Sequence, residues 1–364
     1  MKRIVIDARE LRTSTGRYVE RLLHYLQQVD SGHDYVVLLQ PKDMDGWQPT
    51  NPHFTKVATP FKEFTFGEQL GFMGQIKSLR PDLVFFPMVQ QPVLYRGKTV
   101  TCMQDLTGIR FRNPTKNPLV YSVKQQIYKW VNKYVARKSD ALIAPTNFVA
   151  DDVAAYTHVP REKFTVTYES ADYLPGEPEP LPALQNKKFI MYVGRPQPHK
   201  NLWRLVEAFQ ILKQQFPDLQ LALVGKKDDM YRIIVRRVQA AGIPDVVFTD
   251  FVSDAALKWM YENCQAYIFP SLSEGFGLPG LEAMRHGAAV ASSNATCLPE
   301  VNGDAAHYFD PLDVTDMAAK IAEIIAEPTL KKQLIAKGKA QVAKYSWKRM
   351  AEQTLQVFQK TLAE

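Results

Sequence analysis

Residues 273–282 read Ser-Glu-Gly-Phe-Gly-Leu-Pro-Gly-Leu-Glu and join an apolar run, which predicts a buried strand, to the start of a helical pattern. The free N–H groups of a first helical turn and the helix dipole both favour an anionic ligand. Gly275 and Gly277 allow the backbone to approach such a ligand without a Cβ in the way. The stretch therefore predicts an anion-binding turn at the end of a strand.

The two glutamates of this stretch, Glu274 and Glu282, lie eight positions apart. Carboxylates repel phosphate but accept hydrogen bonds from sugar hydroxyls. A turn that offers donors to phosphate and acceptors to hydroxyls predicts a site for a nucleotide sugar. The competing interpretation is an ordinary strand-to-helix turn whose carboxylates face solvent.

Length and composition are typical of a soluble globular protein with two domains. The chain has 364 residues, of which 46% are hydrophobic and 23% charged. No apolar run approaches the roughly 20 residues that span a bilayer, and no signal peptide precedes the first predicted strand. The three cysteines are scattered, which favours reduced thiols in the cytoplasm over a disulfide framework or a zinc site.

Apolar runs alternate with helical patterns along the chain, which predicts parallel sheets with both faces covered. Strands are predicted at residues 3–8, 35–39, 82–86, 99–103, 141–144, 164–168, 189–194, 219–224, 246–251, 266–270 and 288–293. Helices are predicted at residues 17–26, 67–79, 118–138, 146–157, 202–216, 231–241, 254–263, 314–326, 330–344 and 346–362, with Thr146 and Ser253 as N-caps.

Four prolines between residues 174 and 182 exclude regular structure there and predict a linker. The chain is therefore expected to be α/β, with two tandem Rossmann-like domains at residues 1–174 and 187–345 joined by a linker at 175–186. The last helix, residues 346–364, is expected to pack back on the N-terminal domain. Ligands of such sheets bind beyond the carboxyl ends of the strands.

Two cations follow the strand that ends at Gly194. Arg195 leaves the strand end, and Lys200 begins the next helical segment. A guanidinium fork and an ammonium point charge at the mouth of a sheet can neutralise a diphosphate. The alternative is that both are solvated loop cations.

These motifs together resemble the retaining GT-B glycosyltransferases with an E-x7-E motif, which are glycosyltransferase family 4, group 1. The resemblance is specific in the second half, through residues 193–195, 200–202, 274–279, 282–284, 298–301 and 303–305. It is looser in the first half, through residues 16–18 and 105–107. It implies that the two domains face each other across a cleft.

The resemblance also implies roles for individual residues. Arg195 and Lys200 would hold the donor diphosphate and stabilise the departing nucleotide. Glu274 would contact the donor sugar, and Glu282 would accept from the ribose hydroxyls. The remaining donor contacts would come from Gly16, Val252, Gly275, Phe276, Gly277 and Leu278.

The resemblance further implies transfer without a metal or other cofactor, with retention of the anomeric configuration and same-face attack. The spacing around Arg195 and Lys200 is most like that of mannosyltransferases of polysaccharide biosynthesis, so GDP-mannose is favoured over UDP-sugars as the donor. The expected acceptor is a glycan or a lipid-linked sugar.

Gln104 departs from the family pattern, which usually has His before the first-domain Asp. Glutamine can orient a hydroxyl or the sugar but cannot carry charge or move a proton. If Gln104 is a catalytic-site residue, three outcomes stay open: low activity, an altered donor, or a non-catalytic protein that binds nucleotide sugar or membrane. A nucleotide-sugar epimerase is a further alternative. A glycogen-type phosphorylase is disfavoured, because this sequence shows no site for the pyridoxal-phosphate lysine that such an enzyme needs.

The segment from residue 110 to 138 carries eight basic residues and no acidic one, out of a net charge of +7. Aromatic side chains lie between the cations, as in a basic amphipathic helix on an anionic membrane. The alternative is a core helix with a solvated cationic face, and nucleic acid is not expected. An acceptor or a peripheral contact at the inner face of the cell membrane would involve Arg110, Arg112, Lys124, Lys129, Trp130 and Lys133.

Overall fold

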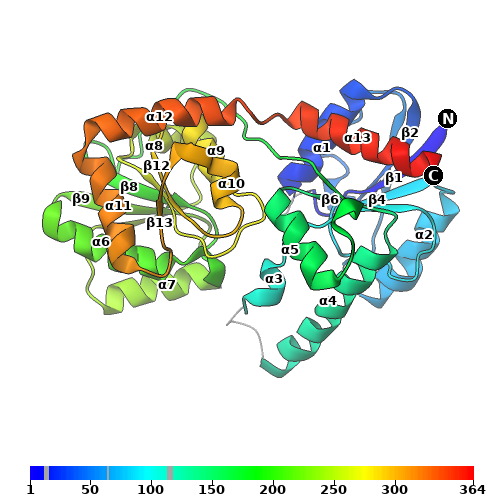
Figure 1. Cartoon of the computed structure of the whole chain (residues 1–364), viewed down its shortest axis with the longest axis horizontal. Coiled ribbons are helices and arrows are strands. Elements are labelled where there is room, and N and C mark those ends of the chain that lie inside the picture. The colour runs from blue at the N-terminus through cyan, green and yellow to red at the C-terminus, as the bar shows by residue number, and fades with distance from the viewer. Residues whose placement is uncertain (12–15, 64, 113–117) are drawn as a thin grey trace. The chain divides into compact units, whose positions relative to one another are not determined.

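The computed structural model describes residues 1–11, 16–63, 65–112 and 118–364, and its contacts divide the chain into two compact units (Figure 1). Unit 1 contains the described residues of Met1–Ile109, Pro118–Glu169 and Ser346–Glu364. Unit 2 contains Ser170–Tyr345 and residues 110–112. The chain passes from unit 1 to unit 2 at Glu169, five residues before the boundary expected from the proline-rich segment.

Unit 1 is built on a seven-stranded parallel sheet with the order β3-β2-β1-β4-β5-β6-β7. Every residue of β4 and β5 is buried, as expected for central strands covered on both faces. The strands are β1 (Lys2–Asp7), β2 (His33–Leu39), β3 (Phe54–Ala58), β4 (Leu83–Phe86), β5 (Thr99–Cys102), β6 (Ala141–Ala144) and β7 (Phe164–Val166).

Two helices of the first half, α1 and α5, begin at a glycine and after a polar cap respectively. Thr146, for example, accepts a hydrogen bond from the backbone N–H of Val149 through its Oγ1, at 3.2 Å, and so confirms the predicted cap. The helices are α1 (Gly16–Val29), α2 (Met73–Ser78), α3 (Thr107–Arg110), α4 (Pro118–Lys138) and α5 (Asn147–Thr157), with short 3₁₀ turns at Pro41–Asp43 and Arg161–Lys163.

The C-terminal helix α13 (Trp347–Ala363) belongs to unit 1, where it packs against α1. Its Phe358 ring lies 5.2 Å from the ring of Phe85 in β4, measured between centroids. The Nζ of Lys98 donates to the carbonyl of Thr361 at 2.9 Å. A helix from the far end of the sequence thus completes the hydrophobic layer over the first sheet.

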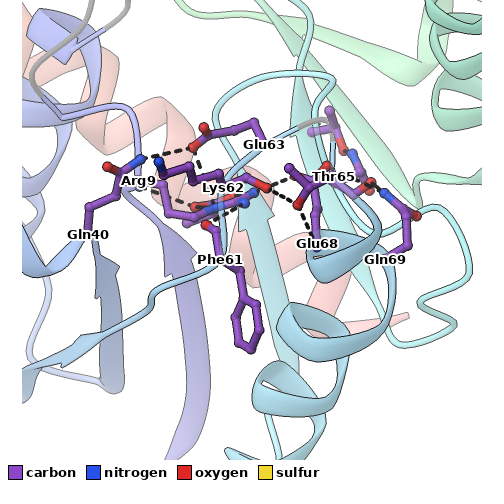
Figure 2. A network of polar contacts seen from close by, with 11 residues as sticks. Arg9, Gln40, Phe61, Lys62, Glu63, Thr65, Glu68 and Gln69 are labelled. Carbon is purple, nitrogen blue, oxygen red and sulfur yellow. Dashed lines mark hydrogen bonds and ion pairs between the residues drawn. The ribbon is translucent and has the colours of Figure 1, made fainter.

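A buried arginine organises the carboxyl end of β1. Arg9 is 1% exposed, and its guanidinium makes two hydrogen bonds to the carboxylate of Asp7, at 2.9 and 2.7 Å, and one to Glu68 at 2.8 Å. Figure 2 shows Arg9, Glu63 and Glu68 joined in one network. Burial alone would lower the pKa of Arg9, but Asp7 and Glu68 outweigh burial and raise it.

The segment that supplies Glu68 is not a regular helix. Residues Glu68–Phe72 form a π-helical turn before α2, where the sequence predicts an uninterrupted helix over 67–79. Glu68 and Phe72 both contact the guanidinium of Arg9: Glu68 accepts from its Nη2 at 2.8 Å, and the Arg9 Cζ lies 3.9 Å from the Phe72 ring centroid. The irregular turn thus carries two of the side chains that surround the buried cation.

Unit 2 is built on a six-stranded parallel sheet with the order β10-β9-β8-β11-β12-β13. One cluster of buried aliphatic and aromatic side chains in its core comes mainly from the strands and from α6 and α11. The strands are β8 (Lys188–Val193), β9 (Leu219–Val224), β10 (Val246–Asp250), β11 (Tyr267–Phe269), β12 (Val290–Ser293) and β13 (Ala306–Phe309).

Most helices of unit 2 agree with the predicted pattern to within a few residues, whereas the short helix at Leu298–Asn302 was not predicted. Ser253 caps α8 by accepting from the N–H of Ala256 at 3.1 Å, as predicted. The helices are α6 (Leu202–Gln215), α7 (Asp229–Ala240), α8 (Asp254–Asn263), α9 (Leu278–Arg285), α10 (Leu298–Asn302), α11 (Val314–Ala326) and α12 (Pro328–Val342), with 3₁₀ turns at Pro198–Lys200 and Gly303–Ala305.

Two strands escaped the sequence prediction, and both lie at sheet edges. β3 pairs only with β2, and β13 pairs only with β12. Edge strands bury one face or less, so β3 carries a lysine and β13 a histidine instead of a continuous apolar run. The pattern that identifies buried strands is absent from them.

Candidate active site: a paired lysine and glutamate at the carboxyl edge of the second sheet

The first sequence-predicted cation, Arg195, lies directly after β8. Gly194 has φ +149°, and a Cβ there would lie 2.6 Å from the Tyr192 hydroxyl, so only glycine fits this exit from the strand. Arg195 is exposed, and within the described part of the chain its guanidinium has no hydrogen-bond or ion-pair partner. It is therefore available to an anion.

Lys200 is fixed by the residue that follows it. Asn201 adopts the left-handed conformation with φ +59°, and its Nδ2 donates to the carbonyls of Pro270 at 3.0 Å and Pro311 at 2.7 Å. These bonds tie the loop after β8 to the segments that follow β11 and β13. Lys200, at the end of the 3₁₀ turn Pro198–Lys200, is held at the carboxyl edge of the sheet.

Lys200 and Glu274 form an ion pair across that edge. The lysine Nζ lies 2.6 Å from the glutamate Oε1, and the side chains are 19% and 11% exposed. The structure thus brings together two residues that lie 74 positions apart and that the sequence assigns to the same site. A charge-assisted bond at this burial holds both groups in one geometry.

The backbone of Glu274 is anchored by the segment between β12 and α10. Its N–H donates to the Oγ1 of Thr296 at 3.1 Å, and its carbonyl accepts from the Sγ of Cys297 at 3.2 Å. Burial raises the pKa of Cys297, and the charge of Glu274 raises it further, so this thiol stays protonated and remains a donor. Sequence reasoning missed both anchoring residues because neither lies in a recognisable motif.

The imidazole next to Lys200 is neutral. Burial, followed by the positive charge of Lys200, lowers the pKa of His199 to about 4. Its ring packs 5.8 Å from the ring of Phe111, and its carbonyl accepts from Leu272 N–H at 2.7 Å. At neutral pH the positive charge of this loop therefore comes from Arg195 and Lys200 alone.

The glycine-bearing turn leads into α9 as predicted. Gly277 has φ +95°, and a Cβ there would lie 2.8 Å from Leu298 Cδ2, so the position excludes larger residues. Phe276 is 4% exposed and packs edge-on against Tyr345. Leu278 begins the helix, in whose first turn Pro279 has no N–H and the N–H of Gly280 donates to the carbonyl of Gly277 at 3.1 Å. Gly275 precedes the turn.

Two further donor-site candidates differ in exposure. Glu282 lies in α9, one turn after Leu278, and is 5% exposed. Val252 is half-buried in the loop after β10, next to Phe251, which is 81% exposed. An exposed aromatic ring at the carboxyl end of a strand is suited to stacking on a base. The position of Phe251 directly after a predicted strand is the sequence signal that marks it as a candidate.

In unit 1, Gln104 follows β5 and presents an acceptor. Its Nε2 donates to the Pro87 carbonyl at 3.2 Å and contacts the Sγ of Cys102 at 3.3 Å. Within the described residues its Oε1 has no partner. The side chain lines a cavity of about 150 Å³ together with Met88, Val89, Gln90, Met103, Asp105, Tyr128 and Asn132.

Gly16 begins α1 and packs directly on the loop that follows β1. A Cβ at this position would lie 2.1 Å from the carbonyl oxygen of Leu11, so the helix start requires glycine. The role expected of Gly16 in donor binding stays a prediction. Residues 12–15, which precede it, lie outside the described part of the chain.

Two family models match the chain and together take in most of it. Residues 15–173 match "Glycosyltransferase Family 4", and residues 177–341 match "Glycosyl transferases group 1". The chain is a family 4 glycosyltransferase. The two matched segments carry the Gln104 cavity and the Lys200–Glu274 pair respectively.

Relatives and solved structures agree with this assignment. The O-antigen chain mannosyltransferase B of Escherichia coli is 31% identical over 229 residues, and the match takes in 60% of each chain. The sucrose-phosphate synthase of Thermosynechococcus elongatus shares the fold with TM-score 0.77 and 18% identity over the whole of both chains. The Anabaena protein HepE in complex with UDP-glucose does so with TM-score 0.74 and 14% identity, covering 99% of this chain and all of its own. The fold is GT-B.

The residues expected to contact an acceptor or a membrane are divided between the two units. Arg110 and Arg112 group with unit 2, whereas Lys124, Lys129, Trp130 and Lys133 lie on α4 in unit 1. The Nζ of Lys133 lies 4.9 Å from the ring centroid of Tyr156. In the described part of the chain, no helix has the length and apolar character that crossing a bilayer requires.

A buried carboxyl group, Glu169, lies at the last residue of unit 1 before the chain enters unit 2. Burial raises the pKa of Glu169 to about 7, against the opposing effect of Arg17. Glu169 is near Cys102, whose pKa is raised first by burial and further by the charge of Glu169. The sequence gives no signal for this group, because a single Glu after a strand is usually solvated.

Glu169→Gln is expected to change how stability depends on pH. Because the pKa in the folded state exceeds the ordinary value of 4.5, the folded glycosyltransferase binds the proton more tightly than the unfolded chain. Its free energy of unfolding should therefore fall as pH rises from about 4.5 to about 7, by about 3 kcal/mol at most. Urea denaturation at pH 5 and pH 8 should show that the free energy of unfolding falls less in the variant than in the natural protein. An equal fall in both proteins would contradict the assignment.

Proposed function

We propose that this glycosyltransferase moves a mannosyl unit from GDP-mannose to a glycan or lipid-linked acceptor, with retention of configuration and without a metal ion. The observation that carries the proposal is the Lys200–Glu274 pair, 2.6 Å long, on the same sheet edge as the unpaired guanidinium of Arg195. The similarity to a mannosyltransferase supports the choice of sugar.

The charges of unit 2 suit a nucleotide-sugar donor. Arg195 and Lys200 would bind the diphosphate, with Lys200 shared between the phosphate and Glu274. The carboxylate of Glu274 would then accept from hydroxyls of the donor sugar. As the bond from C1 to the phosphate oxygen breaks, negative charge grows on the diphosphate, and the two cations stabilise it in the place that a metal ion takes in other transferases.

The acceptor oxygen would bond to C1 on the face that the diphosphate leaves, and the acceptor proton would pass to the departing phosphate oxygen. Gln104 takes no part in this proton transfer because an amide is not a base at neutral pH. Its Oε1, which has no partner among the described residues, would instead accept a hydrogen bond from a hydroxyl of a ligand bound in the unit 1 cavity. The guanine ring would lie by Val252, with Phe251 available to stack on it.

A panel of nucleotide sugars tests the proposal. Nucleotide release from GDP-mannose, UDP-glucose and UDP-galactose would be followed in the presence of EDTA, and the product anomer determined by NMR. We expect the largest kcat/KM with GDP-mannose, no loss with EDTA, and an α-linked product from the α-linked donor. Preference for a UDP-sugar would overturn the assignment of GDP-mannose as the donor. Loss of activity with EDTA would overturn the metal-free mechanism.

A non-catalytic role is the second candidate, and Gln104 is the observation that favours it. Gln104→His restores the usual residue of the family at this position. If the natural chain binds GDP-mannose without turnover and Gln104→His does the same, the protein is a binder. Turnover by the natural chain excludes this candidate.

We also propose that α4 contacts an anionic lipid surface at the inner face of the cell membrane. Val123, Ile127, Trp130 and Tyr134 are exposed, and their spacing of three and four residues places them on one face of the helix. The Trp130 and Tyr134 rings are stacked, with centroids 5.1 Å apart. Lysines on the same helix complement an anionic bilayer.

Vesicle flotation tests this contact. Binding to vesicles that contain phosphatidylglycerol should fall at least about tenfold in the double variant Ile127→Ser, Trp130→Ser, because burial of two large apolar side chains is worth about 3 kcal/mol or more. Leu312→Ser, which removes a leucine that is equally exposed in unit 2, is the matched control. Equal binding by the double variant and the control would contradict the proposal.

A further inference from the structure

A second cavity lies in unit 2 at the amino ends of the strands, whereas Lys200 and Glu274 lie at their carboxyl ends. It has a volume of about 310 Å³ and opens at the amino end of β8, where Phe189 forms part of its wall. This volume is at the lower end of the range of about 300–1,000 Å³ that is typical of small-molecule sites. Because donor-site residues follow the carboxyl ends of the strands, the cavity is separate from the site described above.

The cavity is preformed by the proline-rich linker, which packs on α8. The N–H of Glu179 donates to the carbonyl of Ala255 at 3.1 Å, and the Nζ of Lys258 donates to the carbonyl of Gly176 at 2.9 Å. Leu184 in the linker is fully buried. The walls are thus held in place by hydrogen bonds and apolar packing, although the sequence of the linker predicts no regular structure.

The floor of the cavity is aromatic. The Trp259 indole stacks on the Phe189 ring, with centroids 5.9 Å apart and planes inclined by 23°. Phe189 is 1% exposed, whereas Trp259 is half-buried and so keeps part of its surface open. A flat apolar surface of this kind suits the C–H face of a pyranose ring.

The rim of the cavity carries primary amides. Gln185, Asn186 and Asn263 are exposed, and within the described residues the side chains of Gln185 and Asn186 have no partner. Asn263 donates to the Trp259 carbonyl at 2.8 Å through Nδ2, which leaves its Oδ1 as an acceptor. Amides donate and accept at the same time, which matches sugar hydroxyls. Among the described residues no carboxylate lines the cavity, and the lining includes one charged side chain, that of Lys187.

We propose that this cavity binds a neutral hexose unit of a glycan chain, as a secondary site remote from the chemistry. The proposal rests on the proposed function for the identity of the sugar, which we take to be a mannose residue of the acceptor or product. A second hold on the glycan would keep a long chain at the enzyme between transfers, because the two contacts act at a high effective concentration. It would lower KM for long acceptors and leave short ones unaffected.

A titration with mannotetraose, without any donor, tests the site independently of turnover. The signal would be the indole N–H resonance of Trp259 in the full chain, assigned with Trp259→Phe. We expect a saturable shift in the natural protein and in Gln333→Ala, which removes an exposed amide on α12. Gln185→Ala with Asn263→Ala should weaken binding by about tenfold, because two hydrogen bonds are lost.

Absence of a saturable Trp259 shift in the natural protein would overturn the proposal, and so would equal affinity in the double variant. Maltotetraose serves as the comparison ligand. A shift with maltotetraose in place of mannotetraose would support the cavity as a glycan site and would count against the mannosyl part of the proposed function. The double variant should keep kcat with short acceptors, since the rim residues lie at the amino ends of the strands and the donor site lies at the carboxyl ends.

Discussion

Lys200→Ala is expected to lower kcat for sugar transfer by about 100- to 1,000-fold, the usual effect of removing one preorganised group that stabilises transition-state charge. The variant removes a cation from the diphosphate and also leaves Glu274, which is only 11% exposed, without its partner at 2.6 Å. Both effects act on the same step, since the carboxylate would no longer be held toward the sugar. Steady-state kinetics with GDP-mannose would measure the loss.

Two comparisons make this result specific. Lys332→Ala removes an exposed lysine on α12 and should leave kcat within about twofold of the natural value. Arg195→Ala should also lower kcat, but without disturbing Glu274, so its loss should be smaller than that of Lys200→Ala. A Lys200→Ala variant that is folded by circular dichroism and within threefold of natural activity would contradict the assigned role.

Arg9→Met is expected to destabilise the protein by about 3–5 kcal/mol, which is the cost of leaving buried charges unpaired. The guanidinium is 1% exposed and binds both Asp7 and Glu68, so its removal breaks two buried ion pairs and leaves the buried carboxylate of Asp7 without this cation. It also removes the contact with the Phe72 ring. Urea denaturation at pH 7, followed by circular dichroism, would measure the change in the free energy of unfolding.

The matched control is Arg232→Met. Arg232 pairs with Asp229 on α7, but the two side chains are 62% and 78% exposed. Exposed pairs contribute little, so this change should alter the free energy of unfolding by about 0.5 kcal/mol or less. Equal effects of the two variants would show that the buried network does not stabilise unit 1.

The parallel architecture could be predicted from sequence because its central strands are apolar along their whole length. The strands Leu83–Phe86 and Ala141–Ala144 are examples, and the predicted caps Thr146 and Ser253 are confirmed. The π-helical turn at Glu68–Phe72 could not be predicted, because the pattern of residues 67–79 is that of a continuous helix and carries no sign of the contact between Glu68 and Arg9. Local patterns report which residues are buried but not which buried charges need partners.

In the candidate site, too, some features could be predicted from sequence and others could not. Resemblance to a family pointed to Arg195, Lys200 and Glu274, and the last two form an ion pair in the structure. The bonds that hold them could not be predicted, because Thr296 carries no sequence signal and the motif at residues 200–202 does not show that Asn201 bonds to segments far along the chain. The direction in which Gln104 presents its amide likewise depends on the Pro87 carbonyl, 17 residues away.

The most direct test of the central claim is a crystal structure of the protein with GDP-mannose bound. The account predicts that the diphosphate lies within hydrogen-bond distance of Arg195 and Lys200, with the mannose hydroxyls on Glu274 and the ribose on Glu282. A nucleotide bound elsewhere, or one whose diphosphate contacts neither cation, would contradict it.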